Sequence, residues 1–322
     1  MENHELIWGL PVIAYLFLAG LGAGTLVTSA SLLLRGASRQ KYFPYARYGA
    51  ILSVPTVALG SGLLVLELGS FEVGNWFRWI NLYKTIVLSP MSIGSWLLLI
   101  YLALASVYTL LFLLPGAAPD DKYQDLRLKL AWACVPVGIA VAVYTGILLG
   151  AMPARPLWNS PVLALLFLIS AISTGLAAVL LYGWVVRLFK GKGWTVAKHE
   201  TEVETGYLLG ATDTLMIGLE IMVIFLFFMY AHLTVGDVRT SISVFEPGGE
   251  LFVWFFLGVL LLGLVLPGYI ELREILPRLL RRKKYRHGRV TVFLVPILVI
   301  AGGFLLRYLI VVGGQTSRLA GL

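Results

Sequence analysis

The stretch of sequence that decides the fold is PVLALLFLISAISTGLAAVLLYGWVVR, residues 161–187. It carries no charge before Arg187, its last residue. A membrane-spanning helix needs about 20 predominantly apolar residues, and this run exceeds that length. We therefore predict that the stretch crosses a lipid bilayer as one helix.

Seven further apolar runs of similar length flank this one, and the connections between them are short. The eight runs are residues 11–35, 47–69, 91–114, 130–151, 161–187, 207–234, 251–275 and 290–312. The sequence therefore predicts an all-α integral membrane protein with eight transmembrane helices and no soluble domain between them.

The composition supports a membrane protein and excludes several other classes. Of the 322 residues, 59% are hydrophobic and 13% are charged, whereas a soluble domain has roughly 45–50% and 25%. The single cysteine, Cys134, excludes a disulfide framework, a cysteine-ligated zinc site and an iron–sulfur cluster within the protein. Because His232 has no second histidine within the runs, a haem held by paired histidines of facing helices is excluded as well.

Lysine and arginine residues concentrate in every second loop, and this bias predicts the orientation of the protein in the membrane. The strongest cluster is RRKKYRHGR at 281–289. Because basic loops stay on the cytoplasmic side, we expect both termini to face outside. The net charge of +8 then reflects loops at the lipid membrane, not a nucleic-acid surface. We expect a multi-pass protein of a bacterial or archaeal cytoplasmic membrane.

Polar residues gather at the outer ends of the first four runs. They are Tyr15, Glu67, Ser92 and Tyr144, followed by Trp158 in the next loop. A carboxylate, phenols and hydroxyls inside an apolar wall can hydrogen-bond the two carbonyls of a quinone and exchange its protons. The sequence predicts such a site from depth alone, because it does not show which helices are neighbours.

Charged residues within the runs are few, and each is a candidate functional residue because a charge in the bilayer is costly. Asp213 and Glu220 are seven residues apart on the sixth run, so they share a helix face. We interpret them as a proton relay or, alternatively, as a structural pair held by neighbouring polar side chains. Arg307 either reaches the outer interface or neutralises a carboxyl group of another helix.

Three further features receive simpler interpretations. Glu271 and Arg273 lie near the cytoplasmic end of the seventh run, and we interpret them as interfacial residues. The aromatic segment 70–88 and the proline-containing segment 151–160 are either ordinary interface loops or a lid and docking surface. The small residues of GLGAG, residues 20–24, indicate close helix packing.

Six segments together resemble the NrfD/polysulfide-reductase (PsrC-like) membrane-subunit family. They are IWGLPVIAYLFLAGLGAG (7–24), LELG (66–69), SPMSIGSW (89–96), YTGILLGAMPARPLWNSP (144–161), LLFLISAISTG (165–175) and GGFLLRYLIVVGGQ (302–315). The segments spread over nearly the whole sequence and follow the order that they have in the family.

The resemblance implies a fold of two four-helix bundles side by side, residues 1–155 and 156–322. It implies a site for menaquinone or ubiquinone in the first bundle near the outer face, and it links the second bundle to proton conduction. By position, Tyr15, Glu67 and Tyr144 match polar positions of the family, and Ser92 falls in its Ser-Pro-Met-Ser motif. The resemblance also implies that the protein holds no metal, haem or other redox cofactor of its own.

The resemblance further implies a subunit of a respiratory oxidoreductase complex that lacks the catalytic centre itself. Electrons pass between the quinone pool and a ferredoxin-like iron–sulfur subunit docked outside, and the complex is completed by a molybdopterin or multihaem subunit. Two other classes stay open, a proton-coupled carrier and a membrane anchor without a quinone site. The terminal substrate, the quinone type and the direction of electron flow stay open as well.

Overall fold

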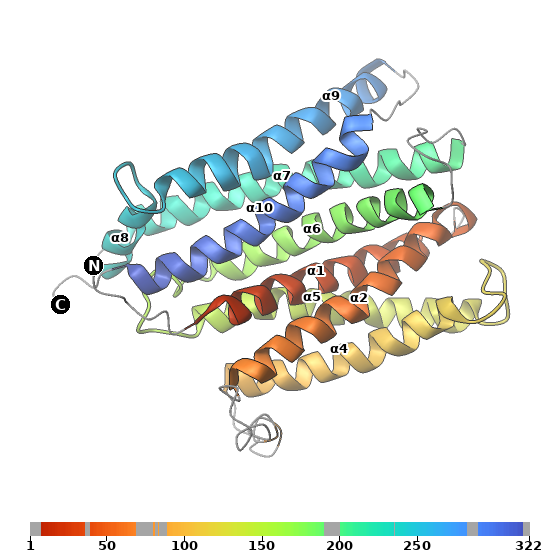
Figure 1. Ribbon diagram of the computed structural model, residues 1–322, viewed down its shortest axis with the longest axis horizontal. Helices are drawn as coiled ribbons and strands as arrows, with labels where there is room; N and C mark the ends of the chain where they lie inside the picture. The colour runs from red at the N-terminus through yellow and green to blue at the C-terminus, as the bar shows by residue number, and fades with distance from the viewer. Residues whose placement is uncertain are drawn as a thin grey trace.

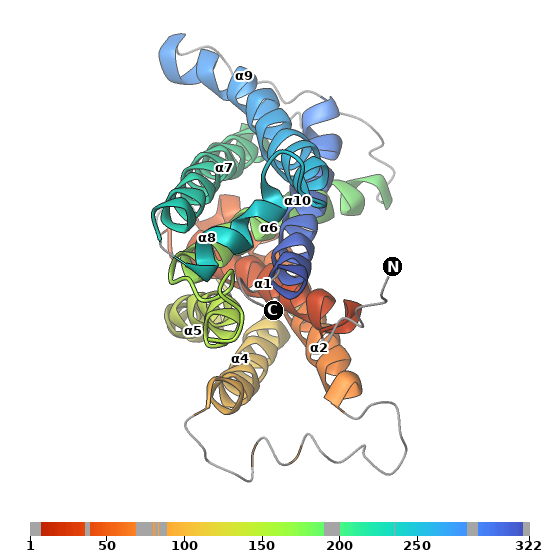
Figure 2. The same cartoon turned by 90° about the vertical axis from the view of Figure 1, so that its left-hand side faces the viewer.

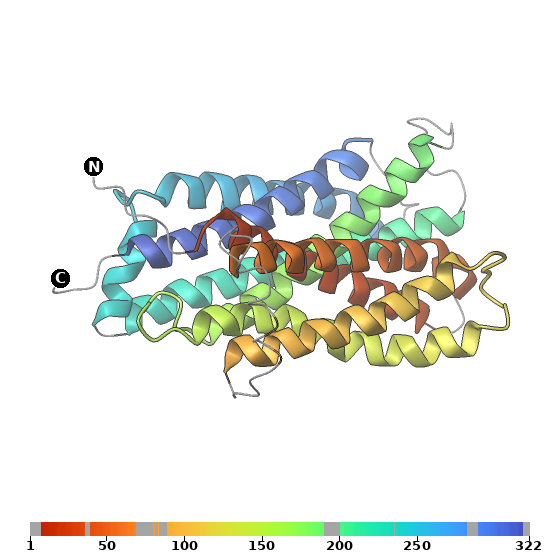
Figure 3. The same cartoon turned by 60° about the horizontal axis from the view of Figure 1, so that its bottom comes forward.

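The computed structural model describes residues 8–35, 39–68, 80, 83, 89–189, 200–234, 236–281 and 289–317. Long helices run along one common axis (Figures 1 and 3), and the described residues contain no strand. The long helices are α1 (Leu10–Leu33), α2 (Arg39–Leu68), α4 (Pro90–Leu113), α5 (Gln124–Gly150), α6 (Val162–Arg187), α7 (Glu200–Leu233), η6 (Trp254–Val265) with α9 (Leu266–Arg281), and α10 (Arg289–Thr316).

The prediction of eight membrane-spanning helices is confirmed, since eight helices in the described part of the protein are long and apolar enough to cross a bilayer. The helices extend beyond several predicted runs. α2 begins at Arg39 and α7 at Glu200, about two turns before the apolar residues do. The apolar run marks the part of a helix that contacts lipid, and it does not mark where the backbone hydrogen bonds end.

The seventh span combines two kinds of helical turn. The short helices α8 (Asp237–Ile242) and η5 (Ser243–Phe245) precede it. Its first half, η6, has wide π-helical turns, and its second half, α9, is an ordinary α-helix. A Cβ atom on Gly263 of η6 would lie 2.7 Å from the Cα atom of Gly302 on α10. Two glycines therefore let the last two spans touch through their backbones.

Helices α1 and α6 occupy the middle of the structure, as the end-on view in Figure 2 shows. α1 packs against α2, α5, α6 and α10, and α6 packs against α1, α2, α5, α7 and α10. The proposed boundary between residues 155 and 156 thus runs through a tightly packed seam. The division into two four-helix bundles stays a prediction.

The contact between α1 and α6 depends on glycine. A Cβ atom on Gly24 would overlap the carbonyl group of Ala171, and one on Gly175 would overlap the backbone of Gly24. The two helices therefore meet backbone to backbone, which only residues without a side chain permit. The prediction that segment 20–24 serves helix packing is confirmed.

The first and last spans meet at one end of the molecule. The backbone N–H of Trp8 donates to the side-chain oxygen of Gln315 at 2.9 Å, and Gln315 Nε2 donates to the Trp8 carbonyl at 3.2 Å. An even number of spans brings the start of the first and the end of the last to the same side, and this pairing agrees with that. Which side of the membrane this end faces stays a prediction from the basic loops.

The contact between α1 and α6 at Gly24 and Gly175, here called the glycine seam, is testable by adding one methyl group to either glycine. We expect Gly24→Ala or Gly175→Ala to lower the free energy of unfolding by about 1–3 kcal/mol, because the extra atom overlaps the facing backbone. Thermal unfolding in mild detergent measures the change. Gly218→Ala on α7 is the matched control, since its added methyl group meets open space. Equal stability of the seam variants and the control contradicts the prediction.

Candidate functional site

Two of the predicted site residues, Tyr15 and Tyr144, face one another from α1 and α5. Both side chains are buried, and their phenol groups lie close enough to interact electrostatically. The Tyr144 ring packs directly on the backbone of α4, where a Cβ atom on Gly94 would overlap it. Three helices thus converge on the phenol pair. Gly94 of the SPMSIGSW segment has no side chain, and this leaves space for the Tyr144 ring.

The Tyr15 hydroxyl differs from the other fully buried tyrosine hydroxyls. Tyr101 donates to the Gly22 carbonyl at 2.6 Å, and Tyr108 lies 3.1 Å from the Ser29 hydroxyl. Tyr15 has 0% exposure, yet its hydroxyl makes no hydrogen bond of ordinary length and angle with any described residue, and the Tyr144 hydroxyl interacts with it. A buried hydroxyl without a full hydrogen bond is costly, so the Tyr15 hydroxyl can donate to an acceptor placed beside it.

Glu67 and Ser92 lie at the same end of the helices as Tyr15. The Glu67 carboxylate is half-buried at the end of α2, and a Cβ atom on Gly9 would lie 3.7 Å from its Oε1. Ser92 is buried in the first turn of α4. Its N–H donates to the Ser89 hydroxyl at 3.2 Å, so the Ser-Pro-Met-Ser motif also caps the helix.

One residue of this region was not singled out from the sequence. Tyr83 lies close enough to Tyr15 to interact with it electrostatically, and its ring packs edge-on against Trp96 with centroids 5.5 Å apart. The many aromatic residues of segment 70–88 were the only sign in the sequence that a residue such as Tyr83 could reach the site. Apart from Ile80 and Tyr83, residues 70–88 lie outside the described residues, so the interpretation of that segment stays open.

Trp158 lies against α10. Its indole stacks on Trp8 with ring centroids 5.2 Å apart, and its N–H donates to the Ile310 carbonyl at 2.8 Å. The indole N–H is therefore already used, and we assign it no hydrogen bond to a ligand. Beside it lies a cavity of about 380 Å³, which is lined by Trp8, Ala151, Met152, Pro153, Ala154, Arg155, Trp158 and Gln315.

A second group of polar residues follows α7 through the other half of the protein. Asp213 is buried, its Oδ1 accepts a hydrogen bond from Ser173 at 2.7 Å, and its Oδ2 has no partner among the described residues. Glu220, two turns along α7, is buried too and interacts with the Ser170 hydroxyl and with Arg307. α6 thus supplies a hydroxyl to each carboxyl group.

Arg307 does not reach the outer interface. Its side chain has 0% exposure and donates to the Ser170 hydroxyl at 3.1 Å and to the Gly303 carbonyl at 3.0 Å. Its guanidinium group also lies over the Phe17 ring of α1, 5.8 Å from the centroid. Of the two interpretations drawn from the sequence, the structure supports the second, because the Arg307 guanidinium interacts electrostatically with the Glu220 carboxyl group.

The interpretation of Glu271 as an interfacial residue is wrong. Its side chain is buried, accepts a hydrogen bond from Thr214 at 2.9 Å and interacts with Asp213. The error arose because α9 continues to Arg281, so Glu271 lies well inside the helix. Thr214, a hydroxyl residue next to an intramembrane carboxylate, was the signal in the sequence. Glu271, Asp213 and Glu220 follow one another as buried carboxyl groups. Together with Arg307 they are here called the polar line.

The described residues hold no group of three or more histidine, cysteine or carboxylate side chains arranged to bind a metal ion. The chemistry that the two groups offer is hydrogen bonding and proton transfer. The phenol pair with Glu67 offers it at one end of the helices, and the polar line offers it within the second half of the protein.

Comparison with known proteins identifies relatives over the whole sequence. The family model described as "Polysulphide reductase, NrfD" matches residues 1–318. A polysulfide reductase polypeptide of Wolinella succinogenes is 30% identical over 98% of this protein and 96% of its own length. The "Protein NrfD" of Escherichia coli is 31% identical over 82% of this protein and 84% of its own length. A putative dimethyl sulfoxide reductase membrane subunit of Halobacterium salinarum is 25% identical over 54% of this protein and 42% of its own length.

The electrostatic interaction between Glu220 and Arg307 is testable by a double-mutant cycle. We expect Arg307→Gln to lower the free energy of unfolding by about 3–5 kcal/mol, because it leaves the Glu220 carboxyl group buried without its cation. Adding Glu220→Gln should restore most of that loss, since the buried charge is removed. Unfolding in mild detergent measures both variants, and additive losses in the double variant contradict the pairing.

Proposed function

The chain belongs to the NrfD polysulphide reductase family, and from that premise we propose that it is the quinone-reactive membrane subunit of a respiratory oxidoreductase complex. The relatives include proteins named as parts of polysulfide and dimethyl sulfoxide reductases. The catalytic centre of such a complex lies in another subunit. This protein then links that subunit to the menaquinone or ubiquinone pool of the membrane.

The observation that carries the proposal is the buried Tyr15 hydroxyl, which lies beside Tyr144 but makes no hydrogen bond of ordinary geometry with a described residue. A buried donor without a partner is stabilised when a ligand supplies an acceptor, and a quinone carbonyl is an acceptor of the right kind. Both phenols belong to the apolar core of the helices, and a prenylated quinone requires apolar surroundings. The residues present therefore fit a quinone as substrate.

The protein's own residues have distinct roles in this proposal. Tyr15 and Tyr144 hold the head group by hydrogen bonds, and Ser92 lies in the first turn of the neighbouring α4. Oxidation of a quinol releases two electrons and two protons, and the half-buried Glu67 carboxylate accepts a proton at the end of α2. In the reverse direction the same groups deliver protons to a quinone.

The two electrons need an acceptor outside this protein. We propose a ferredoxin-like iron–sulfur subunit, docked on the end that carries Trp8, Arg155 and Gln315, with a molybdopterin or multihaem subunit beyond it. The Arg155 guanidinium donates to the Gln315 carbonyl at 3.1 Å, so segment 151–160 is held against α10. That arrangement favours a docking surface over a simple interface loop. The distribution of basic loops favours an orientation in which this end lies outside the cytoplasmic membrane.

We propose that the polar line conducts protons. Its carboxyl groups are buried and linked to hydroxyl groups of α6 and α7. Asp213 interacts electrostatically with both Glu271 and Glu220. Ionisable groups inside a membrane protein that pair with one another are typical of proton relays. The same buried groups support a second candidate function, a proton-coupled carrier. A membrane anchor without a quinone site is the third, and the variants below separate the three.

The quinone site is tested with two tyrosine variants of identical chemistry. We expect Tyr15→Phe to lower quinol oxidation by the assembled complex at least about tenfold, because it removes a hydrogen-bond donor from the head group. Tyr108→Phe, the matched control, removes an equally buried hydroxyl that bonds Ser29, and turnover should stay near that of the unaltered complex. Reduction of the electron acceptor by a quinol analogue is measured.

Glu67→Gln is tested in the same assay and should also lower quinol oxidation at least about tenfold, because the amide accepts no proton. Co-purification of the partner subunits controls for assembly. Full turnover of both Tyr15→Phe and Glu67→Gln in assembled complexes would leave the membrane-anchor function.

The polar line is tested by its own pair of substitutions. We expect Asp213→Asn combined with Glu220→Gln to abolish the proton movement that accompanies quinone turnover in liposomes, because the amides accept no proton. Glu204→Gln is the control on the same helix, since Glu204 is exposed and pairs with Lys41. Unchanged coupling in the double variant leaves only a structural role for Asp213 and Glu220. Proton uptake without any quinol would support the carrier.

A further inference from the structure

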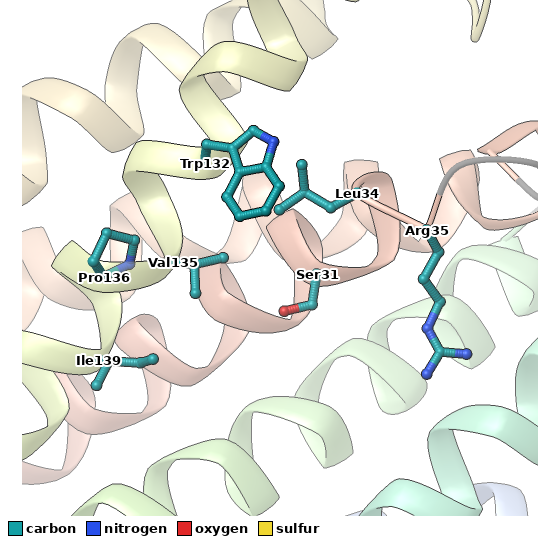
Figure 4. Close-up of a pocket in the computed structure, with 7 residues that line it drawn as sticks. All are labelled: Ser31, Leu34, Arg35, Trp132, Val135, Pro136 and Ile139. Carbon is teal, nitrogen blue, oxygen red and sulfur yellow. The ribbon is translucent and has the colours of Figure 1, made fainter.

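A groove of about 540 Å³ lies between the last turn of α1 and the first half of α5, at the opposite end of the helices from Tyr15. Its lining residues, drawn in Figure 4, are Ser31, Leu34, Arg35, Trp132, Val135, Pro136 and Ile139. The proposed quinone chemistry uses none of these residues. The groove opens on the part of the protein that faces lipid.

The rim of the groove carries a positive charge. Arg35 follows the end of α1 and is exposed. Its side chain has no hydrogen bond or ion pair with any described residue, and Figure 4 shows it extending from the rim away from Trp132. Ser31, one turn earlier, adds an exposed hydroxyl group. The Arg35 guanidinium and the Ser31 hydroxyl thus lie next to an apolar groove.

The floor of the groove is apolar and runs toward the middle of the membrane. Val135, Pro136 and Ile139 follow one another along α5. Trp132 stands at the rim beside Leu34 (Figure 4) with 70% of its surface exposed. Tryptophan concentrates where lipid head groups meet acyl chains, so its position marks that depth. Pro136 has no N–H, which leaves the Trp132 carbonyl without its helical partner at the same rim.

We propose that this groove binds an anionic phospholipid. Arg35 binds the phosphate, Trp132 anchors the head-group region, and an acyl chain lies along Val135 and Ile139. Basic pockets between transmembrane helices on the cytoplasmic side are suited to anionic head groups, and the basic loops place this end on that side. A quinone head group carries no negative charge for Arg35 to bind, so the charge favours a lipid.

Photo-crosslinking in vesicles tests the proposal. The full-length protein is reconstituted into phosphatidylcholine vesicles that contain either phosphatidylglycerol or phosphatidylcholine with a photoactivatable acyl chain, and labelled peptides are mapped. We expect the anionic probe to label the peptides around 31–35 and 132–139 about fivefold more than the zwitterionic probe, since one basic side chain at the surface favours anionic lipid by about that factor. High salt should reduce the difference.

Two variants and one control decide the outcome. Arg35→Gln should remove the preference for the anionic probe, and Ile139→Trp should reduce labelling by both probes because it fills the floor of the groove. Lys122→Gln, which removes a charge at the same end where Lys122 lies over the Tyr123 ring, should leave labelling unchanged. Equal labelling by the two probes, a preference that survives Arg35→Gln, or displacement by a quinone analogue overturns the proposal.

Discussion

The structure depends on one close contact, the crossing of α1 and α6 at Gly24 and Gly175. In a bilayer, helices gain little from burying apolar side chains against each other, because lipid is just as apolar. Close backbone approach is therefore the main source of specific helix association. At this crossing no Cβ atom fits on either glycine. The two central helices are thereby placed at one height and one spacing, and the remaining spans pack around them.

This crossing also brings the two candidate functional groups into contact with one helix. α1 carries Tyr15 of the phenol pair and, less than two turns further on, Gly20. A Cβ atom on Gly20 would lie 2.7 Å from the Arg307 guanidinium, and Phe17 lies under the same group. The phenol pair and the polar line are thus separated by less than two turns of α1. A movement of α1 on quinone binding would therefore change the contacts that Gly20 and Phe17 make with Arg307.

The two ends of the helices differ in chemistry in a way that suits these roles. The end with Tyr15 holds Glu67, the phenols and the loop at Arg155, and it serves the proposed quinone and partner subunits. The other end holds Arg35, Trp132 and a lipid-facing groove. Buried polar groups in the bilayer need partners, and most of those in the described residues find hydroxyl or backbone groups. The Tyr15 hydroxyl is among the exceptions, and it gives the proposed site its chemistry.

The sequence by itself determined the number and approximate position of the membrane-spanning helices, because the length of an apolar run follows directly from bilayer thickness. It also identified the family, and it singled out Asp213, Glu220 and Arg307, because charges inside such runs are rare. Only the tertiary structure decided which residues are neighbours. It set Tyr15 beside Tyr144 and directed the Trp158 N–H to α10. It also brought Arg307 within electrostatic reach of Glu220, and Glu271 within reach of Asp213. Depth along a helix can be counted from the sequence, whereas the direction of a side chain depends on how helices cross, and here glycine contacts set those crossings.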